Sequence, residues 1–518
     1  MPSSPGWFTT LNDELFFAAK DGDGSELWKT DGTTGGTVQV RDINPGDDDS
    51  FPSDFTVFQG EIYFPAVSQG DTELWGSDGS TGGTRRIVNI RQDGGSNPSE
   101  GSGFYVFNDQ LYFNAKDGSD GVELWRSDGT PEGTEQVIDA DPGDGSSWPF
   151  GFFEFDGDLF FIAEVFNNDV DQYLHHLFRV DGETGDAEQA FDFAIDHFEG
   201  LQIVGEHFYF SGLTDDNGYE LYRSDGTATG TSIVRDIALG PADSSPGNFF
   251  DYEGKLYFTA GDTLDPVKQA PIPNLWVSDG TALGTRKLSA LEVNPNHQFV
   301  EYKNEIFFTA KSETLGWELH KTDGSITGTE VAADINGGEG DSFAIAKTVF
   351  EDQLLFLAKE PSSGWEIWAY DGIATTMIDV HLGGGDVTSE PAFFQFTEFG
   401  NDLVFRGSNP FYGEELFIIR GTTPTQPERL PGDADENGTV DFLDFLALAN
   451  NFGSENATWG QGDFDGNGIV NFLDFLELAN NFGRTVAASA AALQDPAAFD
   501  AVYAEDSADE DDDLVATL

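Results

Sequence analysis

The feature that most constrains this chain is a short segment that recurs at intervals of roughly 48 residues, a period typical of propeller and solenoid repeats. One copy is Glu123–Thr130, with the sequence ELWRSDGT, and close copies are Glu26–Thr33 and Glu220–Thr227. An Asp-Gly pair marks each unit, with its aspartate at Asp31, Asp78, Asp128, Asp181, Asp225, Asp279, Asp323 and Asp371. Self-similarity at such a period indicates an array of equivalent structural units. Residues 1–420 are therefore expected to fold as one repeat array.

Each unit reads as four short strands. Leu111-Tyr112-Phe113 is a short apolar, aromatic run between Gly/Asp clusters, which is typical of a strand buried on both faces. The Glu-Leu-Trp segment is the next strand, and the Asp-Gly pair suits a tight turn because Gly adopts positive φ and Asp tolerates it. Phe104–Phe107 precedes and Gln136–Asp139 follows as the outer strands. Four short antiparallel strands per repeat predict a propeller blade.

The unit resembles the bacterial ELWxxDGT repeat family, whose members are thought to form extracellular β-propellers. This resemblance covers residues 1–420 and implies no known catalytic residues. Eight units carry the Asp-Gly turn, and a ninth, around Leu403–Phe405, has Arg420 at the turn position and no clear fourth strand. The fold class is therefore mainly β, an eight- or nine-bladed propeller of four-stranded blades in which a missing strand could come from elsewhere in the chain.

Two units depart from the repeat through insertions at Phe166–Tyr173 and Thr263–Pro273. Structural drift explains such insertions, but loops on a rigid scaffold are also where binding usually resides. The chain opens in phase with the repeat, since Ser3–Phe8 aligns with Ser244–Phe249, and no secretory signal precedes it. One interpretation is that an upstream leader is missing, and the other is that a blade boundary is the true start.

Charge and composition narrow the function. The 24 Lys and Arg against 94 Asp and Glu give a formal charge of −70, which argues against nucleic acid and anionic membranes as partners. A solvated acidic surface explains most of this charge, and it favours cation binding. The absence of cysteine excludes disulfides and thiolate metal sites. No segment approaches the roughly 18 apolar residues of a membrane span, so membrane insertion is not expected.

Residues 421–431 form a Pro/Thr-rich linker, and a duplicated acidic motif follows it. Two loops in tandem place oxygen-bearing groups at positions 1, 3, 5, 7, 9 and 12 of an EF-hand-type loop, with Gly438 and Gly468 at the sharp turn. The ligands of the first loop are Asp433, Asp435, Asn437, Thr439, Asp441 and Asp444. Those of the second loop are Asp463, Asp465, Asn467, Ile469, Asn471 and Asp474. Because Ca²⁺ takes six to eight oxygen ligands, two calcium ions are predicted, with Thr439 and Ile469 supplying backbone carbonyls.

A helix follows each loop. Phe445, Leu448, Ala449 and Phe452 share one face at helical spacing, and Gly453, like Gly483 in the second copy, is placed to end its helix. The duplication, the position-12 Asp and the position-9 residues resemble a type I dockerin over residues 432–484. This resemblance implies a small all-α calcium-binding domain that binds a cohesin-like protein.

The dockerin family usually carries a Ser/Thr pair at loop positions 10 and 11, but Phe442-Leu443 and Phe472-Leu473 stand there in this chain. The departure leaves calcium binding intact and puts cohesin recognition in doubt. The four apolar residues either contact a divergent partner or pack inside the module, and packing is favoured because Phe is more often buried. Residues 485–518 form an acidic tail that is expected to be disordered, with a docking helix over Asp495–Asp506 as the alternative.

No catalytic motif emerges. The seven histidines lack metal-ligand spacing, and the repeat aspartates are better explained by their turns. We therefore expect a secreted or cell-surface protein that binds without catalysis: the propeller presents a surface for carbohydrate or another ligand, and the dockerin anchors it through a protein partner. The alternative is a dockerin-tethered glycoside hydrolase that degrades polysaccharide, with carboxylates on the propeller.

Overall fold

The structure is a computed structural model of the 518-residue chain. It describes residues 3–22, 24–46, 48–92, 94–119, 121–167, 171–191, 194–195, 200–214, 216–312, 314–378, 380, 385–388, 394–409, 413–421, 432, 434, 440, 442–454, 457–464, 469–482 and 499–501. The chain divides into two compact units, one of Met1–Ile419 with Asp500–Asp513, the other of Arg420–Phe499 with Leu514–Leu518.

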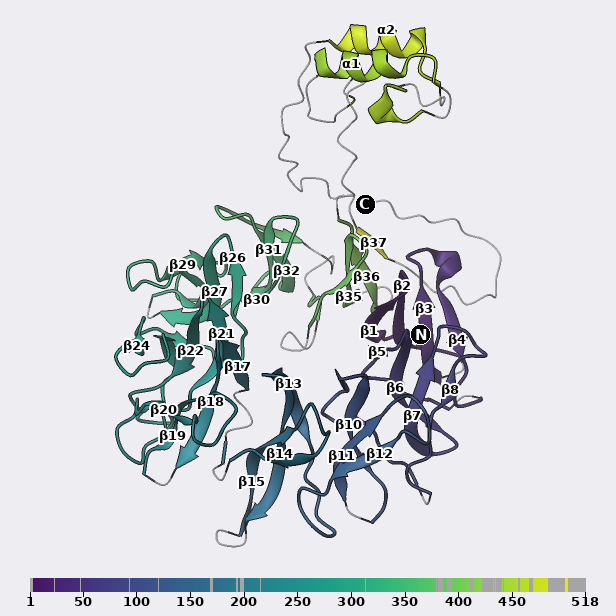
Figure 1. Ribbon diagram of the computed structural model, residues 1–518. Helices are drawn as coiled ribbons and strands as arrows, with labels where there is room; N and C mark the ends of the chain where they lie inside the picture. The colour runs from purple at the N-terminus through teal and green to yellow at the C-terminus, as the bar shows by residue number, and fades with distance from the viewer. Residues whose placement is uncertain are drawn as a thin grey trace. The chain divides into compact units, whose positions relative to one another are not determined.

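The first unit is a nine-bladed β-propeller (Figure 1). Its nine sheets, called blades 1 to 9 in chain order, are arranged in a ring, and each is antiparallel. The prediction of four-stranded propeller blades is confirmed, and the choice between eight and nine is resolved as nine. Blade 7 has a fifth strand, because β25 and β26 both pair with β27.

The strands of blades 1 to 3 are β1 (Gly6–Leu11), β2 (Glu14–Asp21), β3 (Gly24–Thr30), β4 (Val38–Arg41), β5 (Thr56–Phe58), β6 (Glu61–Ser68), β7 (Asp71–Ser77), β8 (Arg85–Arg86), β9 (Tyr105–Phe107), β10 (Gln110–Lys116), β11 (Val122–Ser127) and β12 (Glu135–Ile138). Those of blades 4 to 6 are β13 (Phe150–Phe155), β14 (Asp158–Asn167), β15 (Gln172–Val180), β16 (Ala187–Gln189), β17 (Leu201–Val204), β18 (His207–Thr214), β19 (Gly218–Ser224), β20 (Ser232–Arg235), β21 (Gly247–Tyr252), β22 (Lys255–Ala260), β23 (Asn274–Ser278) and β24 (Arg286–Lys287). Those of blades 7 to 9 are β25 (Glu292–Val293), β26 (Val300–Tyr302), β27 (Glu305–Ser312), β28 (Gly316–Thr322), β29 (Glu330–Ala333), β30 (Ile345–Phe350), β31 (Gln353–Glu360), β32 (Gly364–Tyr370), β33 (Thr375–Ile378), β34 (Thr397–Phe399), β35 (Asp402–Asn409), β36 (Gly413–Ile419) and β37 (Phe499–Ala501).

The core lies between neighbouring blades. The second strand of a blade is buried on both faces, as Leu111, Tyr112 and Phe113 of β10 show, and this confirms the interpretation of the aromatic runs. Phe113 packs with Leu74 of blade 2, so the apolar faces of consecutive blades form one cluster. Burial of such strands removes large aromatic areas from water and is the main stabilising contribution to the ring.

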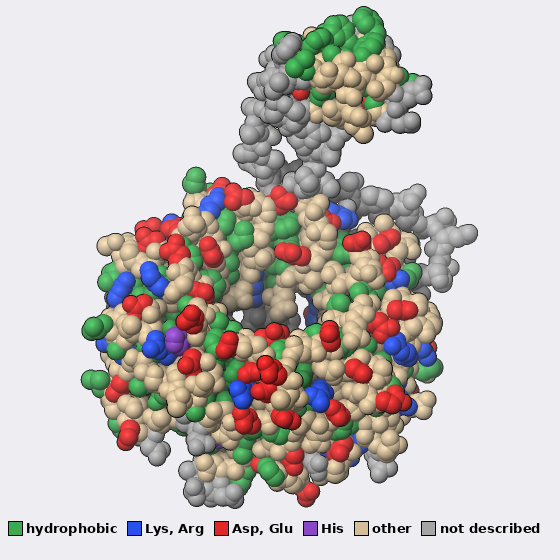
Figure 2. Space-filling view, in the orientation of Figure 1, with side chains coloured by type: hydrophobic (Ala, Val, Ile, Leu, Met, Phe, Trp, Pro, Cys, Tyr) green, Lys and Arg blue, Asp and Glu red, His purple; other side chains and the backbone are tan. Residues whose placement is uncertain are grey.

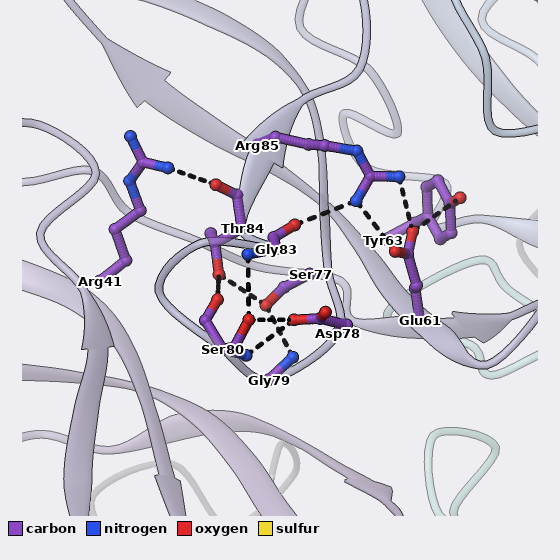
Figure 3. Close-up of polar contacts among 10 residues, drawn as sticks. All are labelled: Arg41, Glu61, Tyr63, Ser77, Asp78, Gly79, Ser80, Gly83, Thr84 and Arg85. Atoms are coloured by element: carbon purple, nitrogen blue, oxygen red, sulfur yellow. Dashed lines mark hydrogen bonds and ion pairs between the residues drawn. The ribbon is translucent and has the colours of Figure 1, made fainter.

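The repeated turn is a closed hydrogen-bond network, shown for blade 2 in Figure 3. Asp78 Oδ1 accepts hydrogen bonds from the backbone N–H of Ser80 (2.8 Å) and from its hydroxyl (2.6 Å). The hydroxyls of Ser77 and Thr84 lie 2.7 Å apart and join the two strands at the base of the turn. The hydrogen bonds from the Ser80 hydroxyl and backbone N–H hold the pKa of Asp78 below its usual value. The motif Ser-Asp-Gly-Ser/Thr-x-x-Gly-Thr therefore defines the turn through its own hydrogen bonding.

One interaction crosses to the next blade at six of the nine blade boundaries in the described part of the chain, and we call it the clasp. Blades 4 and 6 carry His176 and Asn274 in place of the glutamate. The Glu of the Glu-Leu-Trp segment is buried, and it accepts hydrogen bonds from a serine at the start of the following unit. In blade 3, Ser147 N–H donates to Glu123 Oε1 (3.0 Å) and its hydroxyl donates to Glu123 Oε2 (2.6 Å). Clasps with the serine hydroxyl join Glu26 to Ser50, Glu73 to Ser96, Glu220 to Ser244 and Glu318 to Ser342.

The same clasp closes the ring. Ser3 N–H and hydroxyl donate to Glu415 at 3.3 and 2.5 Å, across 412 residues of sequence. Leu15 and Phe17 of blade 1 pack with Val404 of blade 9 behind this contact. The first and last blades are therefore joined by a clasp and by apolar packing, as other clasped neighbours are. Neither blade contributes a strand to the sheet of the other.

The fourth strand of blade 9 comes from the end of the chain. β37 pairs with β36, so Phe499–Ala501 completes the sheet. The expectation that a missing strand is supplied from elsewhere is confirmed, and the alternative of a docking helix over Asp495–Asp506 is wrong at these three residues. The remainder of the predicted tail lies outside the described residues.

The second unit contains two helices, α1 (Phe442–Asn451) and α2 (Phe472–Asn481), with the short 3₁₀ helix η2 (Trp459–Gln461) between them. Leu448 of α1 and Leu478 of α2 are buried in one small core with Val440, Phe464 and Val470. In the part of the chain that is described, no helix combines the length and apolarity that crossing a membrane requires.

The turn network predicts that Gly83→Ala lowers the free energy of unfolding by roughly 1–3 kcal/mol, because forcing extra volume into a packed site costs that much. A Cβ on Gly83 would lie 2.0 Å from Asp78 Oδ1. Gly82→Ala is the matched control, since a Cβ there meets nothing within 4 Å. Urea unfolding of both variants measures the difference, and equal losses would contradict the proposed role of the turn.

The clasp predicts a pH dependence. Burial raises the pKa of Glu123 from 4.5 to about 7, against the opposing effect of its hydrogen bonds. The folded protein therefore binds a proton more tightly than the unfolded chain, so this group's contribution to stability is complete below pH 4.5 and falls as pH rises toward 7. Relative to Glu123→Gln, the wild type should lose on the order of 3 kcal/mol of unfolding free energy over that interval.

Urea unfolding at several pH values between about 4.5 and 7.5 tests this prediction. The exposed Glu132→Gln variant of the same blade serves as the control, and its profile should run parallel to that of the wild type. A Glu123→Gln profile that also runs parallel would show that the clasp does not titrate in this range.

Candidate functional site

The predicted calcium ligands are described in part. Asp444, Asp463, Ile469, Asn471 and Asp474 belong to the described residues. The other seven, Asp433, Asp435, Asn437, Thr439, Asp441, Asp465 and Asn467, lie outside them. Within the described residues no group of three acidic or histidine side chains is arranged to hold an ion. The geometry of the site therefore rests on the closing carboxylates of the two loops.

These closing carboxylates occupy equivalent environments. Asp444 and Asp474, at position 12 of their loops, are both fully buried at the first turn of α1 and α2. Asp444 Oδ1 accepts a hydrogen bond from the backbone N–H of Ala434 (2.7 Å), and Asp474 Oδ1 accepts one from Phe464 (2.8 Å). Each donor directly follows position 1 of its loop. The helix start is thus tied to the loop start in both copies.

Residues at both ends of the second loop are described. Asp463, at position 1, is only 5% exposed, so two carboxylates of this loop are withdrawn from water. Asn471 N–H donates to Asp474 Oδ2 (2.8 Å), and the Asn471 side chain donates to the Ile469 carbonyl (3.1 Å). Carboxylate, amide and carbonyl oxygens are the donors that hard cations prefer, and thiolates are absent from the sequence. The donor set therefore fits calcium.

Two glycines bring each loop against the opposite helix. A Cβ on Gly432 would lie 2.7 Å from the Cα of Leu478, and one on Gly462 would lie 2.6 Å from the Cα of Leu448. Both glycines also have positive φ, at +103° and +96°. The segment that enters each loop thus crosses the helix of the other copy. The two copies are therefore interlocked at these entry segments.

The predicted helix face is partly wrong. Leu448 is buried and Phe445 partly buried, as expected, but Ala449 and Phe452 are exposed. The buried stripe instead begins at Asp444, because this carboxylate turns inward to reach the loop. Gly453 has φ +86° at the end of α1, as expected for a residue that ends a helix, whereas Gly483 lies outside the described residues.

The expectation that the position-10 aromatic residues pack inside the module is wrong for Phe472. Its side chain is 61% exposed and touches Phe475 from outside, with ring centroids 5.9 Å apart. The side chains of Phe442, Leu443 and Leu473 lie outside the described part of the module. Figure 2 shows apolar side chains gathered on the surface of this unit. Among the side chains of this unit that the structure describes, the large exposed apolar ones are Leu446, Phe452, Ile469, Phe472 and Phe482.

Three histidines of the described propeller residues have structural partners. His320 is buried and contacts the Glu318 carbonyl (3.0 Å), and burial lowers its pKa. His175 and His176 face different neighbours, Glu164 and Gln189, as their alternation on a strand predicts. The clasp glutamates are the residues that sequence reasoning missed. A serine that recurs at a nearly constant distance after each glutamate was the available signal.

Comparison with known proteins identifies one part of the chain. Residues 431–488 match the dockerin type I domain family. No curated protein matches the chain. Among solved structures, a mutant puromycin hydrolase complexed with PGG shares 14% identity at a TM-score of 0.36, with 71% of this chain and 58% of that chain covered.

Two further solved structures are similar to this chain. The β-propeller domain of the Trilobed protease from Pyrococcus furiosus shares 10% identity at a TM-score of 0.31, covering 73% of this chain and 98% of that one. Prolyl oligopeptidase B from Galerina marginata shares 13% identity at a TM-score of 0.39, covering 63% of this chain and 49% of that chain. This chain thus spans less than two thirds of the puromycin hydrolase. The module at residues 431–488 is a dockerin type I domain, and residues 3–419 with Phe499–Ala501 form the nine blades of the propeller.

Proposed function

We propose that this protein is a non-catalytic extracellular binding protein whose dockerin module anchors it to a protein partner in a calcium-dependent manner. Two calcium ions are bound, one in each loop, by the twelve ligands set out above. Asp444 and Asp474 close the two loops. The nine-bladed propeller presents a binding surface that is distinct from this attachment function.

The match of residues 431–488 to the dockerin type I domain carries this proposal. Dockerin type I domains generally bind calcium and cohesin partners and are typically extracellular. The buried Asp444 and Asp474 support the assignment of the loops, since a bound cation would offset the cost of burying the charge of each carboxylate. In each loop the position-12 aspartate accepts a hydrogen bond from the backbone N–H of the residue after position 1, which supports two equivalent sites.

The partner is inferred to be cohesin-like with an apolar contact surface. Position 10 of the second loop carries Phe472, where the family usually has Ser or Thr, and this side chain is exposed. Leu446 and Phe482 add exposed apolar surface on the same small module. Exposed apolar patches of this kind mark interaction sites. A polar cohesin surface would leave these side chains without complementary contacts.

Calcium binding by the full chain is the first test. After chelation, calorimetric titration with Ca²⁺ should show two ions in the dockerin module, and Asp444→Ala or Asp474→Ala should each remove one. Loss of the closing carboxylate removes a ligand that contributes two oxygens in EF-hand loops. Asp31→Ala, which alters an exposed propeller turn, is the control and should leave the stoichiometry unchanged. A titration that shows no bound ion would contradict the proposal.

The anchoring role is tested by affinity capture of partners from the native extracellular fraction, with and without Ca²⁺. We expect one protein to be captured only with Ca²⁺, and Phe472→Ser to reduce its binding at least about tenfold, as loss of a buried aromatic anchor does. Phe51→Ser, at an equally exposed Phe of the propeller, is the control. Capture that is insensitive to Ca²⁺ would refute the anchoring role.

A further inference from the structure

A pocket of about 470 Å³ opens between blades 3 and 4 of the propeller. Its side chains come from the loop before β9, from β10, from the loop before β13, and from the hairpin β14–β15. The lining includes Glu100, Ser102, Asn114, Trp148, Glu164 and His175. Three of these elements depart from the repeat at this place, so the pocket is a local addition to an otherwise regular ring.

The first departure is an enlarged loop. In blade 2 the first strand ends at Phe58, eight positions after the clasp serine Ser50, and the same interval separates Ser147 from Phe155 in blade 4. In blade 3 the interval from Ser96 to Phe107 is eleven. The extra length places Glu100, Gly101 and Ser102 in the pocket wall.

The second departure is an exposed indole held in a constrained position. Trp148 has φ +45° and remains 38% exposed. Its backbone N–H donates to the Val122 carbonyl (3.2 Å), which fixes the chain beside the clasp serine. The same left-handed position carries Asn97, Ser245, Phe51 and Phe343 in other blades, so the indole is what distinguishes blade 4. A tryptophan there sets a flat apolar surface at the mouth of the pocket.

The third departure concerns charge. Glu164 of β14 is paired with His175 of β15, with Glu164 Oε1 and His175 Nε2 3.2 Å apart. Lys20, Lys116 and Lys311 stand at the position of Glu164 in blades 1, 3 and 7. At this position blade 4 therefore has an anionic side chain where blades 1, 3 and 7 have a cationic one. None of the eight lining residues is Lys or Arg, which disfavours phosphate and carboxylate ligands.

Asn114 supplies an oriented acceptor. This side chain is 1% exposed, and its Nδ2 donates to the carbonyls of Glu100 (3.0 Å) and Pro149 (3.4 Å), one from each wall. Among the described residues its Oδ1 has no hydrogen-bond partner. A buried acceptor without a partner is costly, and a ligand hydroxyl can satisfy it. The equivalent positions in blades 1 and 2 are Ala18 and Pro65.

The geometry points to a saccharide-binding site, and the ligand class is a neutral sugar. A sugar ring offers an apolar face for the Trp148 indole and hydroxyl donors around its edge for Asn114 Oδ1 and the two glutamates. The acceptors come from different elements around the wall, which suits donors distributed around a ring better than a single ammonium group. The volume falls within the roughly 300–1,000 Å³ range of small-molecule sites. This site is separate from the dockerin module, so it does not depend on calcium anchoring.

Titration calorimetry of the full chain with neutral sugars tests this assignment. The probes are glucose, galactose, mannose, xylose and their short oligomers, with glucosamine and N-acetyl-lysine methylamide as amine and amide comparisons. We expect at least one neutral sugar to bind with millimolar or tighter affinity, in EDTA as well as in calcium. Trp148→Gly should weaken this binding about tenfold, because the aromatic contact is lost while glycine suits the positive φ.

Phe51→Gly is the matched control, since Phe51 is exposed at the same loop position with φ +45° but does not line the pocket. Glu164→Lys, which installs the residue of blade 3, should also abolish binding while leaving thermal unfolding unchanged. Binding of no neutral sugar, preferential binding of the amine, or equal affinity in Trp148→Gly and wild type would each overturn the assignment.

Discussion

Six of the nine boundaries between described blades share the clasp, a glutamate that accepts hydrogen bonds from the first serine of the next blade. Each blade is a separate sheet, and among the described residues no strand pairing joins one blade to its neighbour. Apolar packing between blades supplies most of the favourable free energy, but packing alone does not fix the angle or register at which blades meet. Where the clasp forms, it constrains that angle and register, because it places backbone and hydroxyl hydrogen bonds at the boundary. Its reuse by Ser3 and Glu415 turns an array into a closed ring.

Much of this fold could be predicted because its determinants are local. The aromatic run around Phe113, the Glu-Leu-Trp strand and the Asp-Gly turn each lie within a few residues and indicate strand and turn directly. The clasp was not predicted, because its two partners, such as Glu123 and Ser147, are 24 residues apart and belong to different blades. A strand supplied from elsewhere was expected for blade 9, but the residues of β37 were not predicted, because its partner β36 is distant in sequence. Non-local pairing leaves only weak traces in one sequence.

In the dockerin module, too, local features could be predicted from the sequence and tertiary contacts could not. Its loop spacing predicts the ligand types, and the buried Asp444 and Asp474 agree with a closing role. The helix face was misjudged because helical periodicity alone ignores the inward orientation of Asp444, which leaves Phe452 facing outward. Phe472 was expected to be buried from its residue type, yet a module with one small core cannot enclose every aromatic side chain. The surplus aromatic surface becomes available for recognition, and the same holds for Trp148 on the propeller.

A crystal structure of the full chain grown with Ca²⁺, with anomalous scattering used to locate the ions, tests the central claim most directly. The account predicts two calcium ions, each contacted by its loop carboxylates and by Asp444 or Asp474, in a chain whose propeller has nine blades and is closed by the Ser3–Glu415 clasp. Loops that hold no ion in the presence of saturating Ca²⁺, or a ring in which Ser3 and Glu415 do not meet, would contradict it.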